Sequence, residues 1–541
     1  MSVSVQGCSD GQAMLTEAME LDRQACDRAR RARDVRFDGR FFIGVTTTGI
    51  YCRPICPART PKDENVRYFP SAAAAEAAGF RPCLRCRPES SPGTPAWLGT
   101  SAVVSRGLRL IAEGALDSGD VEDLAGRLGV TARHLGRLFL AHLGATPLGV
   151  ALTRRAHFAK KLLDETHLGM AEIATAAGFG SVRRFNSHMR RTYARTPTEI
   201  RRLARQRAET ASERYRVRLA YRPPYDWEAI LAFLAARATP GVEIVAGGRY
   251  LRSIMLGEQI GVIDVSHADT GNALVLDVRF PDPRALLSIV ERVRRIFDLA
   301  ADPAAIADHL RGDPLLAPVL LRHPGLRTPG AWDGFEIAVR AVLGQQVSVR
   351  AATTLAGRLA SRFGAPVALG EGLTRLFPAP DRLATAPLED VGVIRSRACA
   401  IRTLAMHVTD GVIGFRGCGN PQQIADALQA IPGIGRWTAE YIAMRAFGEP
   451  DAFLSGDLVL RRIAGGCTTR ALDMQAESWR PWRAYAVMLM WQRANDEAAG
   501  ARTVSRQRTS GTSNLGDVQR RPHDDRDGYA GGSRHPHAIE R

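Results

Sequence analysis

Two closely spaced pairs of cysteines near the start of the chain constrain its fold more than any other feature. The first pair is Cys52 and Cys56, and the second pair is Cys83 and Cys86. Each pair can hold one metal ion from a tight turn, and together they supply the four thiolates that tetrahedral zinc prefers. Four ordinary reduced cysteines are the weaker alternative, because paired spacing rarely arises by chance. The sequence therefore predicts one Zn²⁺ bound by all four cysteines.

The remaining cysteines stand alone in the sequence and predict no further metal site. The total of nine is odd, which argues against a disulfide framework. We interpret the remaining five as small buried or surface residues: Cys8, Cys26, Cys399, Cys418 and Cys467.

The N-terminus lacks the basic and then apolar layout of a signal peptide, and no apolar run approaches the ~20 residues that span a bilayer. We therefore expect a cytoplasmic location without a membrane partner.

The positive charge of the chain indicates a polyanionic partner. The net charge is +17, from 73 Lys+Arg against 56 Asp+Glu, and nucleic acid is the simplest partner for such a chain. An arginine-biased composition without function is the alternative, but the charge is unevenly distributed. Residues 121–210 hold 16 Lys+Arg and 7 Asp+Glu, a net of +9. This concentration is typical of a module that faces phosphates.

Basic residues surround the cysteine pairs, and the segments around them resemble a known family. Arg59, Lys62 and Arg67 lie between the pairs, where they would face DNA phosphates. From Phe41 to Pro88 the chain is similar to the N-terminal domain of the Ada methylation-response regulators. The segments that carry the resemblance are Thr47–Pro54, Glu64–Val66 and Ala78–Cys86.

The Ada resemblance implies a role for each cysteine of the two pairs. Cys52 would accept a methyl group from a DNA methylphosphotriester, with Cys56, Cys83 and Cys86 as its co-ligands. Methylation turns a charged thiolate into a neutral thioether, so a surface that approaches phosphate loses one negative charge. We expect tighter DNA binding after the transfer. A zinc site with a purely structural role is the alternative.

Two later segments share the layout of helix, glycine turn, polar cap and basic helix. In the first, residues 121–130 place apolar side chains on one face, Gly129 ends the helix and Thr131 caps the next. In the second, residues 170–180 precede Ser181 and another basic helix. This layout puts a recognition helix in a DNA major groove. A plain helical bundle with solvated arginines is the alternative, which the local charge of +9 disfavours.

The paired units resemble the AraC-type DNA-binding domain over roughly residues 101–205. The Phe179–Ser181 turn and the later Tyr193–Pro197 segment carry the resemblance. The outward-facing side chains of the two basic helices are the expected DNA contacts: Arg133, Arg137, Arg183, Arg184 and Asn186.

A glycine hairpin and an aspartate mark the C-terminal half. Gly433 and Gly435 predict a tight hairpin between helices, whose amides can hold a DNA phosphate. By itself a helix-hairpin-helix is only a non-specific grip on DNA. Asp457 lies 20 residues beyond Trp437 and follows a glycine, so it could direct a carboxylate into a cleft beside the hairpin. Taken alone, this aspartate is more simply a helix N-cap.

Hairpin and aspartate together resemble the AlkA-type 3-methyladenine DNA glycosylases, over roughly residues 215–495. The matching segments are Pro223–Trp227, Phe233–Ala238, Leu343–Val349, Gly433–Ala439 and Trp479–Ala486. The resemblance implies that Asp457 is the catalytic carboxylate and that Trp437, Tyr441 and Trp491 line the base pocket. Gln346 falls at the position of the wedge that fills the gap left by a flipped base, where AlkA has leucine.

Two related activities are not expected. Lyases related to this family carry a lysine at the position of Trp437, because Schiff-base chemistry needs an amine. No lysine follows Lys161, so lyase activity is excluded unless the N-terminal amine intervenes. Ada proteins often carry a second acceptor domain with a Pro-Cys-His motif, which this chain lacks. We therefore expect no repair of O6-methylguanine.

The complete sequence predicts a multidomain protein: a small four-cysteine zinc α/β domain, an all-α double helix-turn-helix, an α+β domain and an all-α helix-hairpin-helix domain. The function implied is a methyl-sensing transcription activator fused to a monofunctional glycosylase. Its partners would be alkylated and promoter DNA and RNA polymerase, in the bacterial nucleoid. The alternative is a non-enzymatic regulator whose glycosylase-like half only grips DNA. The expected boundaries are 15–92, 101–205, 215–325, 326–495 and a disordered tail at 498–541.

Overall fold

The zinc-binding segment forms a small sheet whose parallel pair of strands sets the position of the cysteines. The computed structural model describes residues 21–93, 102–205, 215–415 and 421–511. The sheet has the order β3-β1-β2-β4, and β2 and β4 are parallel, with Tyr51 opposite Pro82. Phe42, Tyr51, Phe69 and Phe80 form a core beneath it. The elements are α1 (Arg23–Ala32), β1 (Phe42–Val45), β2 (Ile50–Cys52), β3 (Val66–Phe69), α2 (Ala72–Ala77) and β4 (Arg81–Pro82).

The next segment is entirely helical among its described residues and contains both helix-turn-helix units. The elements are α3 (Ala102–Ala112), α4 (Ala115–Ser118), α5 (Val121–Arg127), α6 (Ala132–Leu143), α7 (Pro147–Glu165), α8 (Met170–Ala176), α9 (Val182–Tyr193) and α10 (Pro197–Arg205). The predicted caps are present: Thr131 accepts from the His134 amide at 3.3 Å, and Ser181 accepts from the Arg184 amide at 3.2 Å. The long helix α7 joins the two units.

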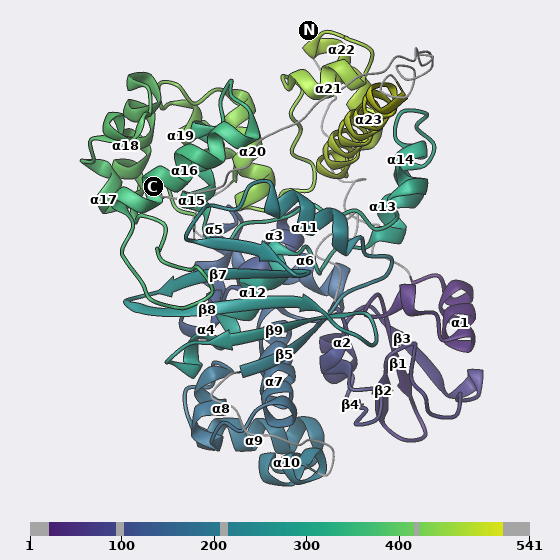
Figure 1. The fold of residues 1–541 in the computed structure, drawn as a ribbon. Helices are drawn as coiled ribbons and strands as arrows, with labels where there is room; N and C mark the ends of the chain where they lie inside the picture. The colour runs from purple at the N-terminus through teal and green to yellow at the C-terminus, as the bar shows by residue number, and fades with distance from the viewer. Residues whose placement is uncertain (1–20, 94–101, 206–214, 416–420, 512–541) are drawn as a thin grey trace, which may run out of the picture. The chain divides into compact units, whose positions relative to one another are not determined.

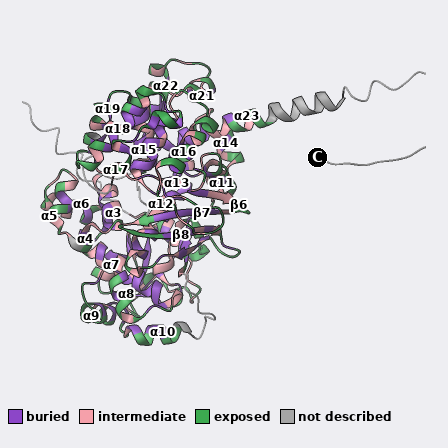
Figure 2. Cartoon of the chain, turned by 60° about the vertical axis from the view of Figure 1, so that its left-hand side comes forward, coloured by how far each residue is buried: buried purple, intermediate pink, exposed green. Residues whose placement is uncertain are grey.

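An antiparallel five-stranded sheet follows, in the order β5-β9-β8-β7-β6 (Figure 1). Its strands are β5 (Tyr215–Ala220), β6 (Glu243–Ala246), β7 (Arg249–Leu256), β8 (Gln259–His267) and β9 (Ala273–Arg279). Two helices, α11 (Trp227–Ala235) and α12 (Leu286–Ile296), belong to the same segment. Apolar residues from the sheet and α12 share one core, among them Ile254, Ile263, Leu276 and Val293. Figure 2 shows this burial along β7 and β8.

The C-terminal segment is a helical assembly around a second core. Phe335, Leu359, Ile401, Leu404 and Ile442 belong to this core. The helices are α13 (Pro303–Leu310), α14 (Ala317–Arg322), α15 (Gly334–Leu343), α16 (Val349–Phe363), α17 (Pro380–Ala384), α18 (Arg395–Thr409), α19 (Pro421–Gln429), α20 (Arg436–Ala446), α21 (Leu458–Ile463), α22 (Thr469–Ala476) and α23 (Arg483–Gly511). Short 3-10 turns cover Val35–Phe37, Asp63–Asn65, Pro88–Ser90, Pro283–Ala285, Leu388–Val391 and Glu477–Trp479.

Helix α23 extends farther than the sequence predicts. It continues to Gly511, although the expected disordered tail begins at Ala498. Ala498, Ala499 and Ala501 are strong helix formers and allow the helix to continue through this stretch. The rest of the expected tail lies outside the described residues, as do Cys8 and Cys418 and the expected linker at 206–214.

The described helices give little indication of a membrane span. No single one is both long enough and apolar enough to cross a bilayer, and only α6 and α7 pass that test as a pair, with a bend of 58° between them. The buried apolar residues of both helices pack in the core of the helical segment.

Candidate functional site

The two cysteine pairs converge at one end of the small sheet. Cys52 ends β2 and Cys83 follows β4, so the parallel pairing brings their turns together. The Sγ atoms of Cys52, Cys56, Cys83 and Cys86 all lie within 4.8 Å of one another, and none of the four forms a disulfide. Tetrahedral zinc with bonds of about 2.3 Å places its sulfur ligands roughly 3.8 Å apart. The donor set and its spacing therefore fit one Zn²⁺, as predicted from the sequence.

The two pairs differ in exposure. Cys83 and Cys86 are buried, at 8% and 6% exposed, whereas Cys52 and Cys56 are half-buried. The Arg53 amide donates to Cys86 Sγ at 3.4 Å, and the Arg53 guanidinium pairs with Asp38. A ligand or substrate can thus approach the first pair more readily than the second.

The basic residues near the cysteines fall into two groups: most are exposed to solvent, and one forms an ion pair within the protein. Most are exposed, namely Arg59, Lys62, Arg67, Arg81 and Arg85. Arg87 instead pairs with Asp164 at 2.6 Å, on helix α7. The exposed cations can contact DNA phosphates, while Arg87 joins the zinc-binding segment to the helical one.

All five predicted DNA contacts of the helix-turn-helix units are exposed. Arg133 and Arg137 lie on α6, and Arg183, Arg184 and Asn186 lie on α9. The opposite faces of these helices are buried through Leu135, Phe139, Phe185 and Met189. Each second helix of a unit therefore presents a polar, mostly cationic face to solvent, as DNA recognition requires.

In the C-terminal segment, Asp457 serves both as a helix cap and as a partner of Trp437. Its Oδ1 accepts from the amides of Val459 and Leu460 at 2.9 and 3.0 Å, at the start of α21. Its Oδ2 accepts from Trp437 Nε1 at 3.1 Å. The N-cap interpretation of this aspartate and its position beside the hairpin are therefore both correct.

The structure brings the three predicted pocket aromatics together. Trp437 and Tyr441 lie one turn apart on α20 and stack, with ring centres 5.4 Å apart and planes 11° apart. Tyr441 also contacts Trp491, with ring centres 6.4 Å apart. By contrast, Trp479 and Trp482 are buried, at 1% and 6% exposed, and belong to the core.

Residues that the sequence did not indicate complete the aromatic cluster. Phe233, on α11, stacks with Trp491 at 6.4 Å. Arg445 Nη1 donates to the Tyr441 hydroxyl at 2.8 Å. Burial alone would raise the pKa of Tyr441, but the guanidinium groups of Arg445, Arg237 and Arg340 outweigh that effect and lower it. Arg445 follows Tyr441 by one helical turn, and this spacing could have indicated their contact from the sequence. Helix α11 lies about 200 residues before Tyr441, so no local spacing indicates its place in the cluster.

The glycine hairpin is joined to the loop that carries Gln346. Gly433 has a φ of +92°, which glycine tolerates without strain, and Gly435 is the N-cap of α20. Gln345 Nε2 donates to Gly433 O at 2.7 Å and to Thr438 Oγ1 at 2.9 Å. Gln346 is exposed and left-handed, with a φ of +52°. Gln345, which was not among the predicted site residues, thus links the wedge position to the hairpin.

Comparison with known families agrees with this arrangement. Residues 25–89 match the metal binding domain of Ada, residues 124–203 a helix-turn-helix domain, and residues 216–333 the AlkA N-terminal domain. Each match falls on a different one of the segments described above.

Individual relatives span both halves of the chain. It is 43% identical over 484 residues to the probable bifunctional transcriptional activator/DNA repair enzyme AlkA of Mycobacterium tuberculosis. This match covers 87% of this chain and 97% of that protein. Against DNA-3-methyladenine glycosylase 2 of Escherichia coli it is 36% identical over 281 residues, 50% of this chain and 95% of the relative. Against the bifunctional transcriptional activator/DNA repair enzyme Ada of Escherichia coli it is 41% identical over 116 residues, 21% of this chain and 31% of the relative.

Proposed function

The chain belongs to the family of bifunctional AlkA transcriptional activator/DNA repair enzymes, and on that premise we propose which residues carry its two activities. The protein joins an Ada-type zinc domain and a helix-turn-helix regulator to a DNA-3-methyladenine glycosylase. Cys52 is the methyl acceptor of the first part, and Asp457 is the catalytic carboxylate of the second. The functional units correspond to residues 15–92, 101–205, 215–325 and 326–495.

The sensor reaction is a methyl transfer to sulfur. The Cys52 thiolate attacks the methyl carbon of a DNA methylphosphotriester, so a carbon–sulfur bond forms. The carbon–oxygen bond breaks, and its electron pair stays on the phosphate oxygen as an ordinary phosphodiester. Cys52, Cys56, Cys83 and Cys86 would hold one Zn²⁺, which when bound would keep the Cys52 thiolate deprotonated. The half-buried position of Cys52, opposite the buried Cys83 and Cys86, supports its assignment as acceptor.

The regulatory output is sequence-specific DNA binding. Methylation removes one negative charge from a surface that carries exposed arginines, and binding to DNA phosphates becomes tighter. The contacts to promoter DNA come from the exposed face of α6 and α9: Arg133, Arg137, Arg183, Arg184 and Asn186. RNA polymerase, recruited to that promoter, is the proposed protein partner, in the bacterial nucleoid.

The observation that carries the glycosylase assignment is the contact between Asp457 and the aromatic cluster. A lesion must leave the base stack before chemistry, at a cost of a few kcal/mol. An N-alkylated purine is cationic, and Trp437, Tyr441 and Trp491 attract it by ~0.5–2 kcal/mol per favourable ring contact. Gly433 and Gly435 hold a phosphate through backbone amides, and Gln346 occupies the gap that the flipped base leaves.

Hydrolysis at the sugar needs only this carboxylate and water. The N-glycosidic bond breaks with its electrons on the departing base, and Asp457 stabilises the oxocarbenium-like sugar. Water adds at C1′ and loses a proton to Asp457 or to solvent. Trp437 occupies the position at which related lyases carry lysine, and no lysine follows Lys161. The enzyme is therefore a monofunctional hydrolase.

Excision of 3-methyladenine from alkylated duplex DNA tests the glycosylase assignment. Wild type and Asp410→Asn, whose carboxylate is exposed at the end of α18, should release the base, while Asp457→Asn should not. The abasic product should stay uncleaved and should not be trapped by borohydride. No release by wild type would instead leave a non-enzymatic regulator that only grips DNA, and borohydride trapping would contradict the monofunctional mechanism.

Intact mass after exposure to methylated DNA tests the sensor assignment. Wild type should gain about 14 Da, one methylene, on Cys52. Cys52→Ala should gain nothing, whereas Cys399→Ala, which removes an exposed cysteine outside the zinc site, should be modified normally. An unmodified wild type would leave the zinc with a structural role.

A further inference from the structure

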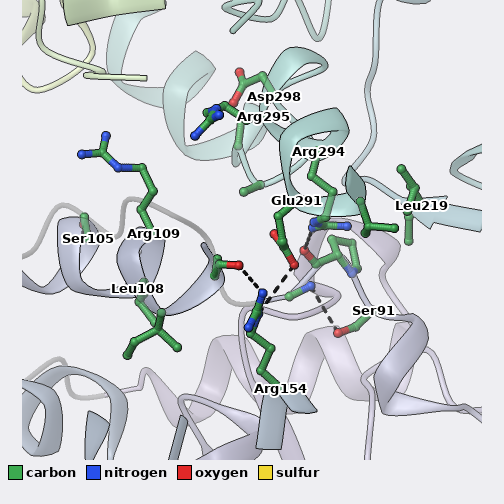
Figure 3. Close-up of a pocket in the computed structure, with 18 of the residues that line it drawn as sticks. Ser91, Ser105, Leu108, Arg109, Arg154, Leu219, Glu291, Arg294, Arg295 and Asp298 are labelled. Atoms are coloured by element: carbon green, nitrogen blue, oxygen red, sulfur yellow. Dashed lines mark hydrogen bonds and ion pairs between the residues drawn. The ribbon is translucent and has the colours of Figure 1, made fainter. Parts of the chain in front are cut away.

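A cavity of about 420 Å³ lies apart from both proposed active sites. Its walls come from the segment that follows the zinc ligands, from α3 and α7, from β5 and α12, and from the turn after α20. No zinc ligand, hairpin glycine or pocket aromatic named above lines it. Figure 3 shows Arg109 on α3 and Arg295 on α12 projecting toward the open space between the helices.

Most charged groups that line the cavity are already matched by an opposite charge. Arg295 pairs with Glu113, Arg106 with Glu449 at 3.5 Å, and Arg154 with Glu291 at 3.8 Å. Two further lining carboxylates are also engaged, Glu89 with Lys160 and Asp302 with Arg40. All five of these carboxylates therefore already have a cationic partner.

Apart from the exposed Arg218, two guanidinium groups of the cavity differ from the rest. Arg109 donates to the carbonyl of Phe447, and Arg294 donates to the carbonyl of Pro92 at 2.6 Å. Neither has a carboxylate oxygen within 4.0 Å among the described residues, in contrast to the three arginines named above. Both cations thus rely on neutral carbonyl groups.

Burial makes these two cations unfavourable without a counter-charge. It lowers the pKa of Arg109 more than the nearby Glu113 and Glu449 raise it, and it lowers the pKa of Arg294 more than the nearby Glu291 raises it. A buried charge is costly unless an opposite charge compensates it. These guanidinium groups, which have no carboxylate in direct contact, therefore favour an anionic ligand, and guanidinium fits phosphate oxygens in a bidentate manner.

The remaining lining indicates what the rest of the ligand resembles. Leu108 and Leu219 offer apolar surface, and Ser91 and Ser105 add hydroxyl groups (Figure 3). Ile111, Val290 and the ring of Trp482 also line the cavity. The volume falls within the ~300–1,000 Å³ that small-molecule pockets occupy. A phosphate attached to a sugar and a flat base matches this set of cationic, hydroxyl and apolar groups.

We propose that this cavity binds a nucleoside monophosphate, whose phosphate pairs with Arg109 or Arg294 and whose base packs against the apolar wall. The walls come from both the regulatory and the glycosylase part of the chain. A bound nucleotide therefore contacts both parts and stabilises the folded protein by mass action.

Calorimetric titration of the zinc-loaded full chain with AMP tests the proposal. Wild type and the exposed control Arg311→Gln should bind one AMP per chain. The single variant that removes the phosphate partner, Arg109→Gln or Arg294→Gln, should weaken binding about tenfold or more, in line with the strength of a charge-assisted hydrogen bond. The double variant Arg109→Gln/Arg294→Gln should lose saturable binding. Adenosine and inorganic phosphate, which each lack one half of the ligand, should bind at least tenfold more weakly than AMP.

Several results would overturn the proposal. Wild type that shows no saturable AMP binding would do so, as would AMP binding that survives in the double variant, because AMP would then occupy another site. Equal affinity for AMP and inorganic phosphate would leave an anion site without a base subsite. Thermal unfolding without ligand guards against misfolding, since Arg109→Gln and Arg294→Gln, which break no ion pair, should unfold close to wild type, whereas Arg295→Gln, which breaks a pair with Glu113, should be less stable.

Discussion

Trp437 Nε1 donates a hydrogen bond of 3.1 Å to Oδ2 of Asp457, and this contact joins the wall of the base pocket to the proposed catalytic carboxylate. The other oxygen of Asp457 is engaged by two amides at the start of α21. Three N–H donors thus fix the carboxylate in place before any DNA arrives. Such preorganisation is what stabilisation of a cationic sugar requires.

Replacing the indole by a ring without an N–H tests this contact. Trp437→Phe keeps an aromatic ring beside Tyr441 but removes the donor to Oδ2. We expect single-turnover excision of 3-methyladenine to slow about tenfold, the value of one hydrogen bond of roughly 1.4 kcal/mol. Tyr441→Phe, which also keeps its ring but does not touch Asp457, shows how much of any loss comes from removing a polar group from the pocket wall. Excision at the wild-type rate by Trp437→Phe would show that Asp457 is positioned without the indole.

The connection between Gln345 and the hairpin predicts a role in DNA binding. Gln345→Ala removes the donors to Gly433 and Thr438, so the loop that carries Gln346 should lose its fixed position. We expect the affinity for abasic duplex DNA to fall about threefold to tenfold, for one or two hydrogen bonds. Fluorescence anisotropy measures this affinity. Gln346→Ala leaves both hydrogen bonds in place and therefore measures the contribution of the wedge side chain alone. An affinity that is unchanged in Gln345→Ala would show that these hydrogen bonds do not position the loop.

The features that the sequence predicts are those set by local chemistry. The cysteine pairs, the caps Thr131 and Ser181, and the start of α21 at Asp457 each depend on residues close to them in the chain. Phe233 stacks with Trp491, and Arg237 lies close enough to lower the pKa of Tyr441. Both contacts depend on α11 packing against helices far away in the sequence, which no local pattern indicates. The pairing of the five strands β5 to β9 depends on distant segments in the same way, because partner strands decide which apolar runs join a sheet.

The buried carboxylate of Glu243 predicts a dependence of stability on pH. Burial alone would raise its pKa, but Arg340, Arg252 and the Thr239 amide lower it to about 2. The folded state therefore favours the charged form. The resulting stabilisation is present above the ordinary glutamate pKa of about 4.3 and is lost as the pH falls toward 2.

Glu243→Gln should remove that stabilisation and leave two buried arginines short of a partner. We expect a loss of about 3–5 kcal/mol in the free energy of unfolding at neutral pH, measured by urea denaturation. The gap to wild type should narrow as the pH falls below about 4, because wild-type Glu243 then becomes protonated. Glu258→Gln, an exposed turn position, is the control. A gap that stays constant with pH would contradict the assigned shift.

Removal of zinc should unfold the segment that contains the four cysteines more than the rest of the chain. The sheet β3-β1-β2-β4 has a small core of its own, and small domains commonly depend on a bound metal. After chelation we expect one zinc to be released per chain and protease to cleave within residues 21–93. Excision of 3-methyladenine should persist, because Asp457 and its partners lie elsewhere. Protease resistance of residues 21–93 in the metal-free protein would contradict this dependence.

The residue before Cys52 is tied to the helix that joins the two DNA-binding units. Tyr51 donates to Glu76 Oε1 at 2.9 Å, and Thr153 on α7 donates to the other oxygen of Glu76 at 2.7 Å. Glu76→Gln should keep one zinc per chain but lower the free energy of unfolding by about 1–3 kcal/mol, because a buried network loses an acceptor. Glu64→Gln, exposed in the same segment, should change stability little. Equal melting temperatures for the two variants would show that α7 does not depend on Glu76 for its contact with the zinc-binding segment.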